Sequence, residues 1–387
     1  MGLLLASALF AVALLQALII GRWRNAINER PNPSLEGEGS LPSVTVIVPA
    51  RNEEACIVQV LQDLHRQSFP KEQMQVIVVD DGSTDRTALI AEGMRYAWPQ
   101  LRVLCSHGSG KKAAITTGID AAEHEFIVLT DADARFGPER MNTIVRVLSS
   151  SDADLLILPV WTIGEGWLGA LQREEQAALL GITLGAALGG SATLAYGANL
   201  AFKREAFRAV GGYHGDRFTS GDDVFLLRRL RAEGKRVRAL MHADALVNVD
   251  AEISWRGFFA QRIRWAGKMR GAIDAFSLLG AIGLLWPWAL ALCTARFSFI
   301  GAMGQHGFYQ LVLLLMAWVL WVAPIIGMVQ DVKRAFSKPS GTAPTLLALL
   351  AFTVYAPLIA LLSLVVRPKW KGRRVPPRTA DRPRHPR

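Results

Sequence analysis

The sequence predicts an α/β domain with a mostly parallel sheet, flanked by membrane segments. Short β-branched runs alternate with amphipathic stretches from residue 43 to about residue 270. Apolar stretches of near-membrane length lie on both sides of this region, at residues 3–20 and beyond residue 275. Acidic residues follow three of the β-branched runs, at the strand ends where parallel sheets bind ligands. We therefore expect a chemically active domain at residues 43–270.

The composition and charge exclude several classes of protein. Of 387 residues, 51% are hydrophobic and 20% are charged, which excludes a disordered chain. The formal net charge is +10, of which +8 falls in residues 367–387. A basic segment beside an apolar one is typical of contact with anionic lipid headgroups, and no nucleic-acid-binding motif accompanies it. We expect a membrane partner and no nucleic acid.

A membrane helix is predicted at residues 1–21. The apolar run at residues 3–20 approaches the length that crosses a hydrocarbon core. A cleaved signal peptide is the alternative, but no basic residue precedes the run, and Arg22 and Arg24 follow it. The positive-inside rule puts the carboxyl end of this helix in the cytoplasm. Residues 22–42 are expected to be a linker.

Strands are predicted at four runs of the central region, and the amphipathic stretches between them are expected to be helices. These strands are residues 44–48, 76–79, 126–129 and 155–158. Because the carboxyl ends of parallel strands meet at one edge, the acids after the first three runs are expected to converge. Each segment alone also fits a turn or a helix cap. The three segments are Pro49-Ala50-Arg51-Asn52-Glu53-Glu54, Asp80-Asp81-Gly82-Ser83-Thr84-Asp85 and Thr130-Asp131-Ala132-Asp133.

A metal-bound diphosphate is the ligand that these acids favour. Carboxylates gathered at one edge repel one another unless a cation compensates them. Asp131 and Asp133 are the metal candidates, because Mg²⁺ and Mn²⁺ take oxygen ligands and bridge carboxylates to substrate phosphates. Lys111 and Lys112, in a glycine-rich loop, are expected to contact the same phosphates, although the spacing is not that of a P-loop.

A carboxy-terminal membrane region is expected at residues 271–366, before a basic cytoplasmic tail at residues 367–387. Its first apolar segment contains Trp286-Pro287-Trp288, so a span, a re-entrant hairpin and an interfacial helix all stay open. If all three segments crossed, the basic tail would lie outside, against the positive-inside rule. We therefore expect the last two segments to span and the first segment to be non-spanning or re-entrant. The three segments are residues 276–293, 309–329 and 346–366.

Seven motifs in order resemble those of the membrane-bound family 2 glycosyltransferases, which include cellulose and hyaluronan synthases and ceramide glucosyltransferase. The resemblance covers roughly residues 43–268. It implies a GT-A fold, a Rossmann-like nucleotide-diphospho-sugar transferase domain, with flanking transmembrane helices. The motifs are Val48-Pro49-Ala50-Arg51-Asn52-Glu53-Glu54, Val79-Asp80-Asp81-Gly82-Ser83-Thr84-Asp85, Asp131-Ala132-Asp133, Gly197-Ala198-Asn199, Gly211-Gly212-Tyr213, Gly221-Asp222-Asp223 and Gln261-Arg262-Ile263-Arg264-Trp265.

The resemblance also implies a role for each matching residue. Asp223 would be the catalytic base, with Asp222 beside it where the family more often has Glu. In the Gln-x-x-Arg-Trp motif, Arg264 would meet the departing diphosphate and Trp265 would line the acceptor site; an interfacial amphipathic helix is the alternative for this segment. The expected metal ligands are Asp131 and Asp133, for Mg²⁺ or Mn²⁺. The expected substrate contacts are Arg51, Glu53, Asp80, Asp81, Lys111, Lys112, Asp131, Asn199, Gln261, Arg264 and Trp265.

These roles describe an inverting transfer in one displacement. Asp223 would remove the proton of the acceptor hydroxyl as it attacks the anomeric carbon. A divalent cation, Arg264 and the two lysines would stabilise the leaving diphosphate. A hydrolase with two carboxylates is the rival, but it uses a protonated acid and a water rather than a metal–diphosphate site.

The resemblance implies a UDP-sugar donor and a lipid or glycan acceptor. The chain lacks an evident Phe-x-Val-Thr gating loop, and few spans are predicted, so we favour transfer of one sugar to a lipid or lipid-linked acceptor. A processive polysaccharide synthase and a non-catalytic membrane scaffold on the same fold are the alternatives. The ending Trp370-Lys371-Gly372-Arg373 resembles that of small family members. We expect a multi-pass protein of the cell inner membrane with a cytoplasmic catalytic domain.

Overall fold

The protein is described here by a computed structural model. The described residues are 2–30, 40–216, 221–268, 275–297, 307–366, 369–371 and 373–374. The chain divides into two compact units. The helical unit comprises residues 1–29, 165–185 and 252–366, and the sheet unit comprises residues 30–164, 186–251 and 367–387.

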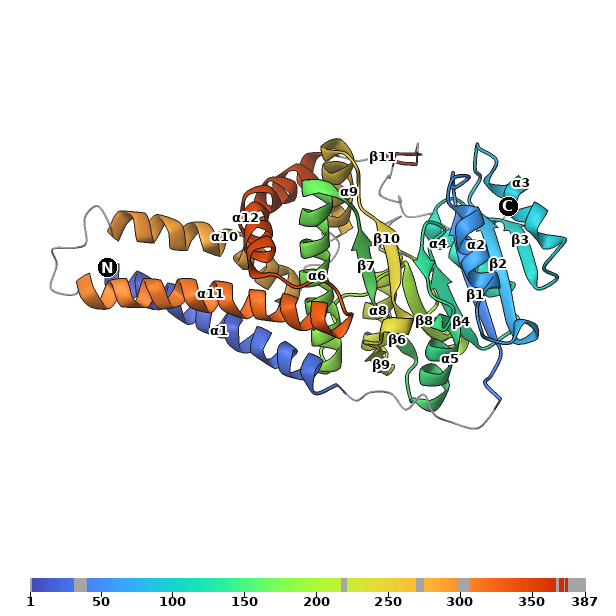
Figure 1. The fold of residues 1–387 in the computed structure, drawn as a ribbon, viewed down its shortest axis with the longest axis horizontal. Coiled ribbons are helices and arrows are strands. Elements are labelled where there is room, and N and C mark those ends of the chain that lie inside the picture. Colours follow the sequence, from blue (N-terminus) through green and yellow to red (C-terminus); the bar gives the residue numbers. More distant parts are fainter. Residues whose placement is uncertain are drawn as a thin grey trace, which may run out of the picture. The chain divides into compact units, whose positions relative to one another are not determined.

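A seven-stranded sheet forms the centre of the sheet unit, in the order β3-β2-β1-β4-β8-β6-β9 (Figure 1). Every neighbouring pair is parallel except those that β8 makes with β4 and β6. The prediction of a mostly parallel sheet is therefore confirmed, and the four predicted strands correspond to β1, β2, β4 and β6. The strands are β1 Val44–Ala50, β2 Met74–Asp80, β3 Leu101–Cys105, β4 Phe126–Thr130, β6 Leu155–Ile157, β8 Asn199–Lys203 and β9 Val237–Ala239.

Helices cover both faces of this sheet (Figure 1), which explains why its central strands are buried and mostly apolar. All seven residues of β2 are buried. Two smaller sheets complete the unit: β5 Arg135–Phe136, β10 Val247–Asp250 and β7 Val160–Ile163 form one, and β11 Lys369–Trp370 with β12 Arg373–Arg374 forms the other. The helices are α2 Ile57–His65, α3 Thr87–Arg95, α4 Lys111–Asp120, α5 Arg140–Ser150, α7 Arg204–Ala209 and α8 Asp222–Ala232, with short 3₁₀ helices at Lys71–Gln73 and Ala243–Ala245.

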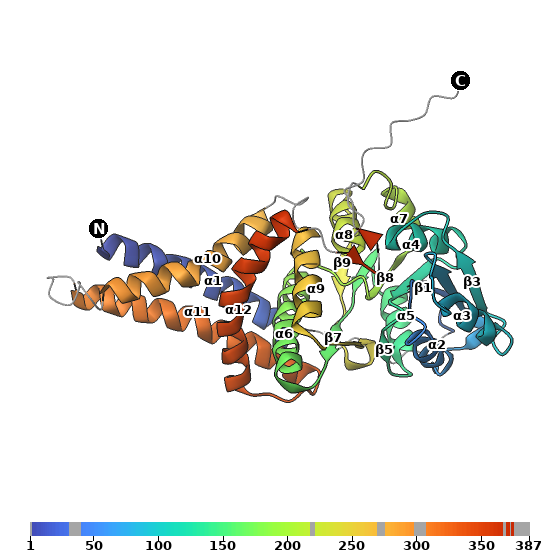
Figure 2. The same ribbon diagram turned by 90° about the horizontal axis from the view of Figure 1, so that it is seen from above.

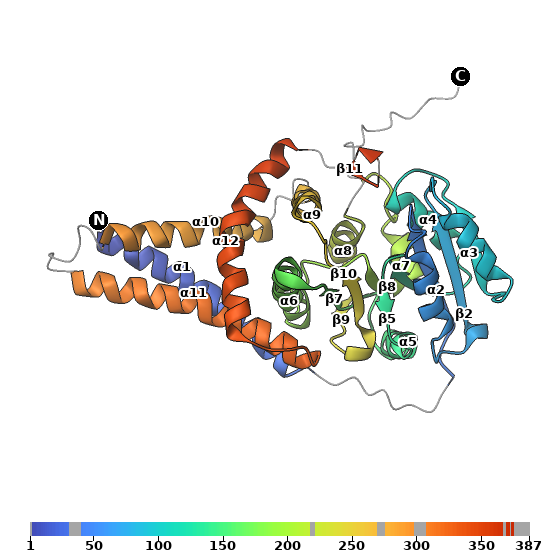
Figure 3. The same cartoon turned by 45° about the horizontal axis from the view of Figure 1, so that its top comes forward.

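The helical unit contains the long apolar helices of both chain ends. Helices α1, α10 and α11 run side by side in all three views (Figures 1, 2 and 3), and α12 crosses them steeply. Within the described residues, α1, α11 and α12 are long and apolar enough to cross a membrane. The helices are α1 Gly2–Asn28, α6 Gly166–Leu188, whose last residues belong to the sheet unit, α9 Trp255–Lys268, α10 Ala275–Arg296, α11 Gly307–Ala335 and α12 Thr342–Val365.

Two sequence-based expectations need correction here. Residues 22–28 continue helix α1 instead of opening the linker, because Arg24 pairs with Asp331 at 2.7 Å and Ile27 is fully buried. The first apolar segment is not a re-entrant hairpin, since α10 continues through Pro287 as one helix. Most of the expected linker, residues 31–39, and most of the basic tail lie outside the described residues.

Candidate active site

The sequence-predicted acids at the ends of β1, β2 and β4 lie at one edge of the sheet, because the three strands are adjacent and in register. Ala50 at the end of β1 pairs with Asp80 at the end of β2. On the other side of β1, Ile47 pairs with Leu129, one residue before the end of β4. The segments that follow the three strands therefore begin side by side.

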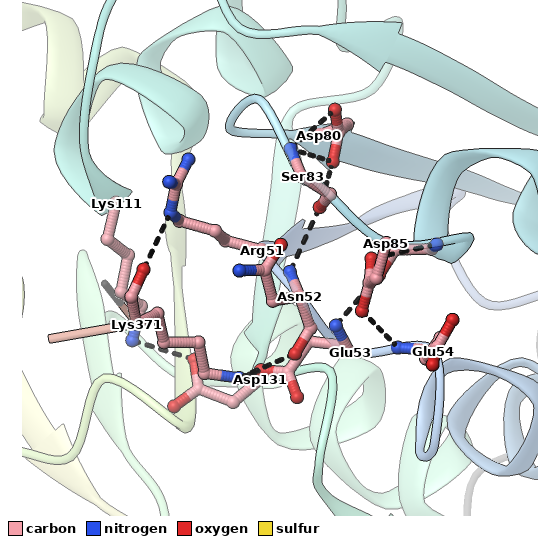
Figure 4. Close-up of polar contacts among 11 residues, drawn as sticks. Arg51, Asn52, Glu53, Glu54, Asp80, Ser83, Asp85, Lys111, Asp131 and Lys371 are labelled. Atoms are coloured by element: carbon pink, nitrogen blue, oxygen red, sulfur yellow. Dashed lines mark hydrogen bonds and ion pairs between the residues drawn. The ribbon is translucent and has the colours of Figure 1, made fainter. Parts of the chain in front are cut away.

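Side-chain to backbone hydrogen bonds join the loops after β1 and β2 (Figure 4). The backbone N–H of Asn52 donates to Ser83 Oγ at 3.0 Å, and that of Glu54 donates to Asp85 Oδ2 at 3.2 Å. In return, Asn52 Oδ1 accepts from the N–H of Thr84 at 2.8 Å. Asn52 itself has a φ of +51°, a conformation that Asn tolerates better than most residues. These bonds fix the two loops as one surface.

Three of the expected substrate-contact residues form hydrogen bonds that stabilise these loops. The Arg51 guanidinium is buried and donates to the backbone carbonyls of Asp81 and Gly82. Asp80 accepts from the N–H of Ser83 at 3.2 Å. Asp81 Oδ1 accepts from the N–H of Gly110 at 2.8 Å, so it joins the second loop to the start of α4.

Lys111 links two predicted motifs that are 91 positions apart in the sequence. Its ammonium lies 2.7 Å from Asp131 Oδ1 and 3.1 Å from Asp222 Oδ2. Burial acts to lower the pKa of Lys111, but the two carboxylates outweigh it and raise that pKa. Burial raises the pKa of Asp131 to about 6, while the Lys111 charge opposes this shift. The predicted diphosphate-binding and catalytic motifs therefore share one cation.

The two acids at the start of α8 differ in their partners. Asp222 is paired with Lys111, whereas Asp223 Oδ2 accepts from the N–H of Gly197 at 3.2 Å and its Oδ1 from the N–H of Val224 at 2.8 Å. Gly197 has no room for a side chain, since an added Cβ would collide with Asp222 Oδ2. This explains the glycine in the Gly197-Ala198-Asn199 motif.

Two predicted substrate contacts have other partners in the sheet unit. Lys112 pairs with Asp216 at 2.8 Å and lies over the Phe225 ring, 4.7 Å from its centroid. Asn199 is fully buried, and its amide donates to the carbonyls of Pro159 and Ala245 while its oxygen accepts from Arg140 at 2.7 Å. This geometry favours a structural role for both side chains.

The site also contains a residue that the sequence analysis did not assign to it. Lys371, in the hairpin of β11 and β12, forms an ion pair with Glu53 and donates to the carbonyl of Asn52 at 3.3 Å. Burial raises the pKa of Glu53 to about 7, although Lys371 opposes this shift. Lys371 is 318 positions from Glu53, and its only sequence signal was the Trp-Lys-Gly-Arg ending.

The carboxylates after β4 fit a hard divalent cation. Asp133 is exposed, and Asp131 is half-buried next to it. Across the residues that the structure describes, no group of three or more potential metal ligands is preassembled. This set suits a cation that completes its coordination with phosphate oxygens and water, as Mg²⁺ and Mn²⁺ do.

The predicted Gln261, Arg264 and Trp265 lie on α9, in the helical unit. The motif is therefore helical, and it belongs to the unit that holds the long apolar helices. Trp265 lies against the guanidinium of its neighbour Arg262, 4.5 Å from ring centroid to carbon. Helix α9 packs against α12 through Phe258, whose ring lies 5.2 Å from that of Tyr355.

Comparison with known proteins identifies the class of this domain. Residues 45–211 match the family model named Glycosyl transferase family 2. The solved structure of the mannosyltransferase PcManGT from Pyrobaculum calidifontis, in complex with GDP-Man and Mn²⁺, aligns with 92% of this chain and 99% of its own. Its TM-score is 0.56 at 22% identity. The fold is that of GT-A glycosyltransferases, and the chain carries a family 2 glycosyltransferase domain, as the motifs predicted.

Among curated proteins, the chain is similar to enzymes of lipid glycosylation. A beta-monoglucosyldiacylglycerol synthase of Synechocystis sp. is 29% identical over 311 residues, which cover 76% of this chain and 61% of that protein. A second protein of that name, from Nostoc sp., is 26% identical over 63% of this chain and 53% of its own. The probable glycosyltransferase YdaM of Bacillus subtilis is 25% identical over 64% of this chain and 57% of its own. The chain thus spans little more than half of these relatives' length.

Proposed function

We propose that the protein is an inverting, metal-dependent glycosyltransferase that moves one sugar from a UDP-sugar to the hydroxyl of a membrane lipid. The observation that carries this proposal is the position of Lys111 between Asp131 and Asp222. The Lys111 side chain thereby joins Asp131, proposed to serve the donor diphosphate, to Asp222, the neighbour of the proposed base Asp223. The two relatives named as monoglucosyldiacylglycerol synthases support a lipid acceptor such as diacylglycerol.

The proposed chemistry divides between Lys111 and Asp223. Asp223 takes the proton of the acceptor hydroxyl while the hydroxyl oxygen attacks the anomeric carbon from the face opposite the diphosphate, so the configuration inverts. Lys111 stabilises the negative charge that develops on the departing diphosphate. When bound at Asp131 and Asp133, Mg²⁺ or Mn²⁺ supplies further charge neutralisation to the same diphosphate.

The contacts at the start of α8 support Asp223 rather than Asp222 as the base. The Asp222 carboxylate is engaged by the Lys111 ammonium, which lies 3.1 Å from its Oδ2. Asp223 is not in that ion pair, and two backbone N–H donors fix the direction of its carboxylate.

We further propose that the protein lies in the cell inner membrane with its sheet unit in the cytoplasm. Contacts within the helical unit support a membrane topology for the long helices. Helices α1 and α11 are parallel, because Gln16 contacts the Trp321 carbonyl and Arg24 pairs with Asp331 further along both helices. If α1 ends in the cytoplasm, as Arg22 and Arg24 favour, α11 begins outside. The chain must then cross outward between them, and we assign this crossing to α10, an apolar helix that lies between α1 and α11 among the described residues. This is the reverse of the sequence-based expectation for that segment.

The same topology favours an interfacial position for α12. Helix α11 ends in the cytoplasm in this arrangement, and Lys371, just after α12, contacts Glu53 of the proposed cytoplasmic sheet unit. If α12 crossed, Lys371 would lie outside. An α12 that lies in the membrane surface keeps the basic segment inside, in agreement with the positive-inside rule.

The first test is UDP release by the full chain in detergent, with Mn²⁺ or Mg²⁺, across UDP-sugars and with or without diacylglycerol or bacterial lipid extract. Asp223→Asn and Asp133→Ala are the inactive controls. We expect lipid-dependent release that both variants lose, with a labelled product that migrates as a lipid. A product too large for a lipid indicates a processive synthase. Nucleotide binding without release in all lipids tested indicates a scaffold.

A further inference from the structure

Arg262 is a buried cation at a position of the Gln-x-x-Arg-Trp segment to which no role has been assigned. Only 6% of it is exposed. Its Nη2 donates to Glu175 Oε2 at 2.7 Å, and its Nε lies 3.1 Å from the same oxygen. Glu175 belongs to α6, and both residues are in the helical unit. One ion pair therefore ties α9 to α6.

The same guanidinium contacts two residues of the motif. Its central carbon lies 4.5 Å from the centroid of the Trp265 ring and 4.6 Å from that of Phe258, so both rings contact its faces. Its Nη1 donates to Gln261 Oε1. The two ring contacts follow from helix geometry, because residues three and four positions from Arg262 share its side of α9. Gln261 is the residue directly before Arg262, and its contact depends on the side-chain hydrogen bond alone.

Because the Glu175–Arg262 pair is buried, the orientation of the guanidinium is fixed. A charged group removed from water is stable only when its partner holds it in good geometry. The planar guanidinium offers donors in one plane and aromatic contacts on its faces, so the Glu175 carboxylate also sets the plane on which Trp265 lies. Elsewhere on α9, Phe258 and Ile263 pack in an apolar cluster with Leu171 of α6 and with Tyr355 and Ile359 of α12.

We propose that Glu175 and Arg262 are positioning residues, which fix the side chains of Gln261 and Trp265 for reaction with the acceptor. This inference rests on the proposed function and on the role that the resemblance implies for the Gln-x-x-Arg-Trp segment, in which Trp265 lines the acceptor site. Glu175 acts on the motif through Arg262, and neither residue needs to touch substrate. Loss of the Glu175–Arg262 ion pair should therefore lower kcat and kcat/KM for the acceptor, without a change in the binding of the nucleotide-sugar.

The decisive variant replaces both partners, Glu175→Met with Arg262→Met. Removal of one partner leaves an uncompensated buried charge and destabilises the protein, whereas two apolar residues of similar size often preserve stability. We expect the double variant to fold and to keep the wild-type KM for the nucleotide-sugar. Its kcat/KM for the lipid acceptor should fall about 100-fold, the loss that a displacement of about 1 Å in a reacting group can cause.

A matched control lies one residue earlier on α6. Glu174 forms a buried ion pair with Lys333 of α11 and accepts from Thr345 at 2.8 Å, without contact to the motif in any described interaction. Glu174→Met with Lys333→Met removes an equally buried pair from the same helix. We expect this variant to keep the wild-type kcat and acceptor KM, whatever its effect on the thermal midpoint.

A second measurement reports the accessibility of the Trp265 side chain and does not depend on enzyme activity. Hydroxyl-radical modification of Trp265, followed by mass spectrometry, should increase in the Glu175→Met/Arg262→Met variant and not in the control. Wild-type modification together with wild-type acceptor kinetics in the first variant would overturn the inference. If the wild-type protein transfers no sugar, the proposed function fails, and the Trp265 modification still decides whether the pair orients the motif. Arg262→Lys should resemble the double variant, since Lys keeps the charge without the plane.

Discussion

The ammonium of Lys111 lies 2.7 Å from Oδ1 of Asp131, and this ion pair occupies the place where the proposed donor diphosphate and its metal would bind. The same ammonium reaches Asp222 at 3.1 Å. A positive side chain at this position competes with a divalent cation for Asp131 and also stabilises a leaving diphosphate. Lys111 should therefore lower the affinity for the metal and raise the rate of turnover.

Substitution of Lys111 by Met should separate these effects. We expect the Mn²⁺ concentration for half-maximal activity to fall, because the carboxylate loses a competing cation. We expect kcat to fall about 100-fold, the usual cost of removing one group that stabilises developing charge. Metal titrations of initial rates measure both. Lys112→Met is the matched control, because Lys112 pairs with Asp216 and should leave the metal requirement unchanged.

Gly197 provides a test by steric displacement alone. An added Cβ would collide with Asp222 Oδ2 and lie 3.1 Å from Lys111 Nζ, so Gly197→Ala must move the ion pair. We expect kcat/KM to fall about 100-fold with little loss of secondary structure. Gly93→Ala in α3 is the control, because its Cβ would meet nothing within 4 Å. Equal activity of the two variants would contradict the proposed site.

The central sheet and its acidic edge were predictable because their signals are local. The runs of Val and Ile that form β1, β2 and β4 are buried on both faces, and the acids follow where each strand ends. Parallel register then brings those acids together without further information. The resemblance to the family rests separately on the seven motifs, three of which contain these acids.

The contacts that complete the site were not predictable, because they join distant segments. Nothing near Lys371 in the sequence indicates that its ammonium pairs with Glu53. Asn199 has the residue type of a ligand contact, but its three buried hydrogen bonds depend on strands and loops from elsewhere in the chain. The packing of α10 beside α1 and α11 likewise arises from tertiary contacts of Trp286 and Leu290.

Glu53 should make the stability of the sheet unit depend on pH. Its pKa in the folded protein is about 7, above the ordinary value of 4.5, so the folded state binds this proton more tightly than the unfolded state. The favourable contribution is present below pH 4.5 and is lost as the pH rises through 7, with a limit of about 3 kcal/mol. Glu53→Gln should therefore raise the thermal midpoint over wild type at pH 8 and not at pH 4.5.

This comparison is made in the absence of divalent metal, since a cation near Asp131 and Asp133 would offset the like charge that raises the Glu53 pKa. Glu54→Gln is the control, because it is the same substitution at the adjacent residue, whose carboxylate is exposed. If wild type and Glu53→Gln lose stability in parallel between pH 4.5 and pH 8, Glu53 is not the responsible group.

The proposed topology predicts which ends of the apolar helices are reached from outside the cell. The test uses single-cysteine variants of a chain whose three native cysteines are replaced by serine. Phe308→Cys reports the start of α11, Ser340→Cys the residues just before α12, and Val366→Cys the end of α12. A membrane-impermeant maleimide should label Phe308→Cys in intact cells, because a parallel α1 and α11 begin on the same side.

Ser340→Cys and Val366→Cys should react only after the cells are permeabilised. The result at Val366 is the sharper one, because α12 has the length and hydropathy of a span. The proposed position of α12 in the surface rests instead on the ion pair of Lys371 with Glu53 of the sheet unit, because Lys371 follows α12 closely in the chain. Labelling of Val366→Cys from outside, with Ser340→Cys protected, would mean that α12 crosses, and Lys371 could not then reach Glu53 in a cytoplasmic domain.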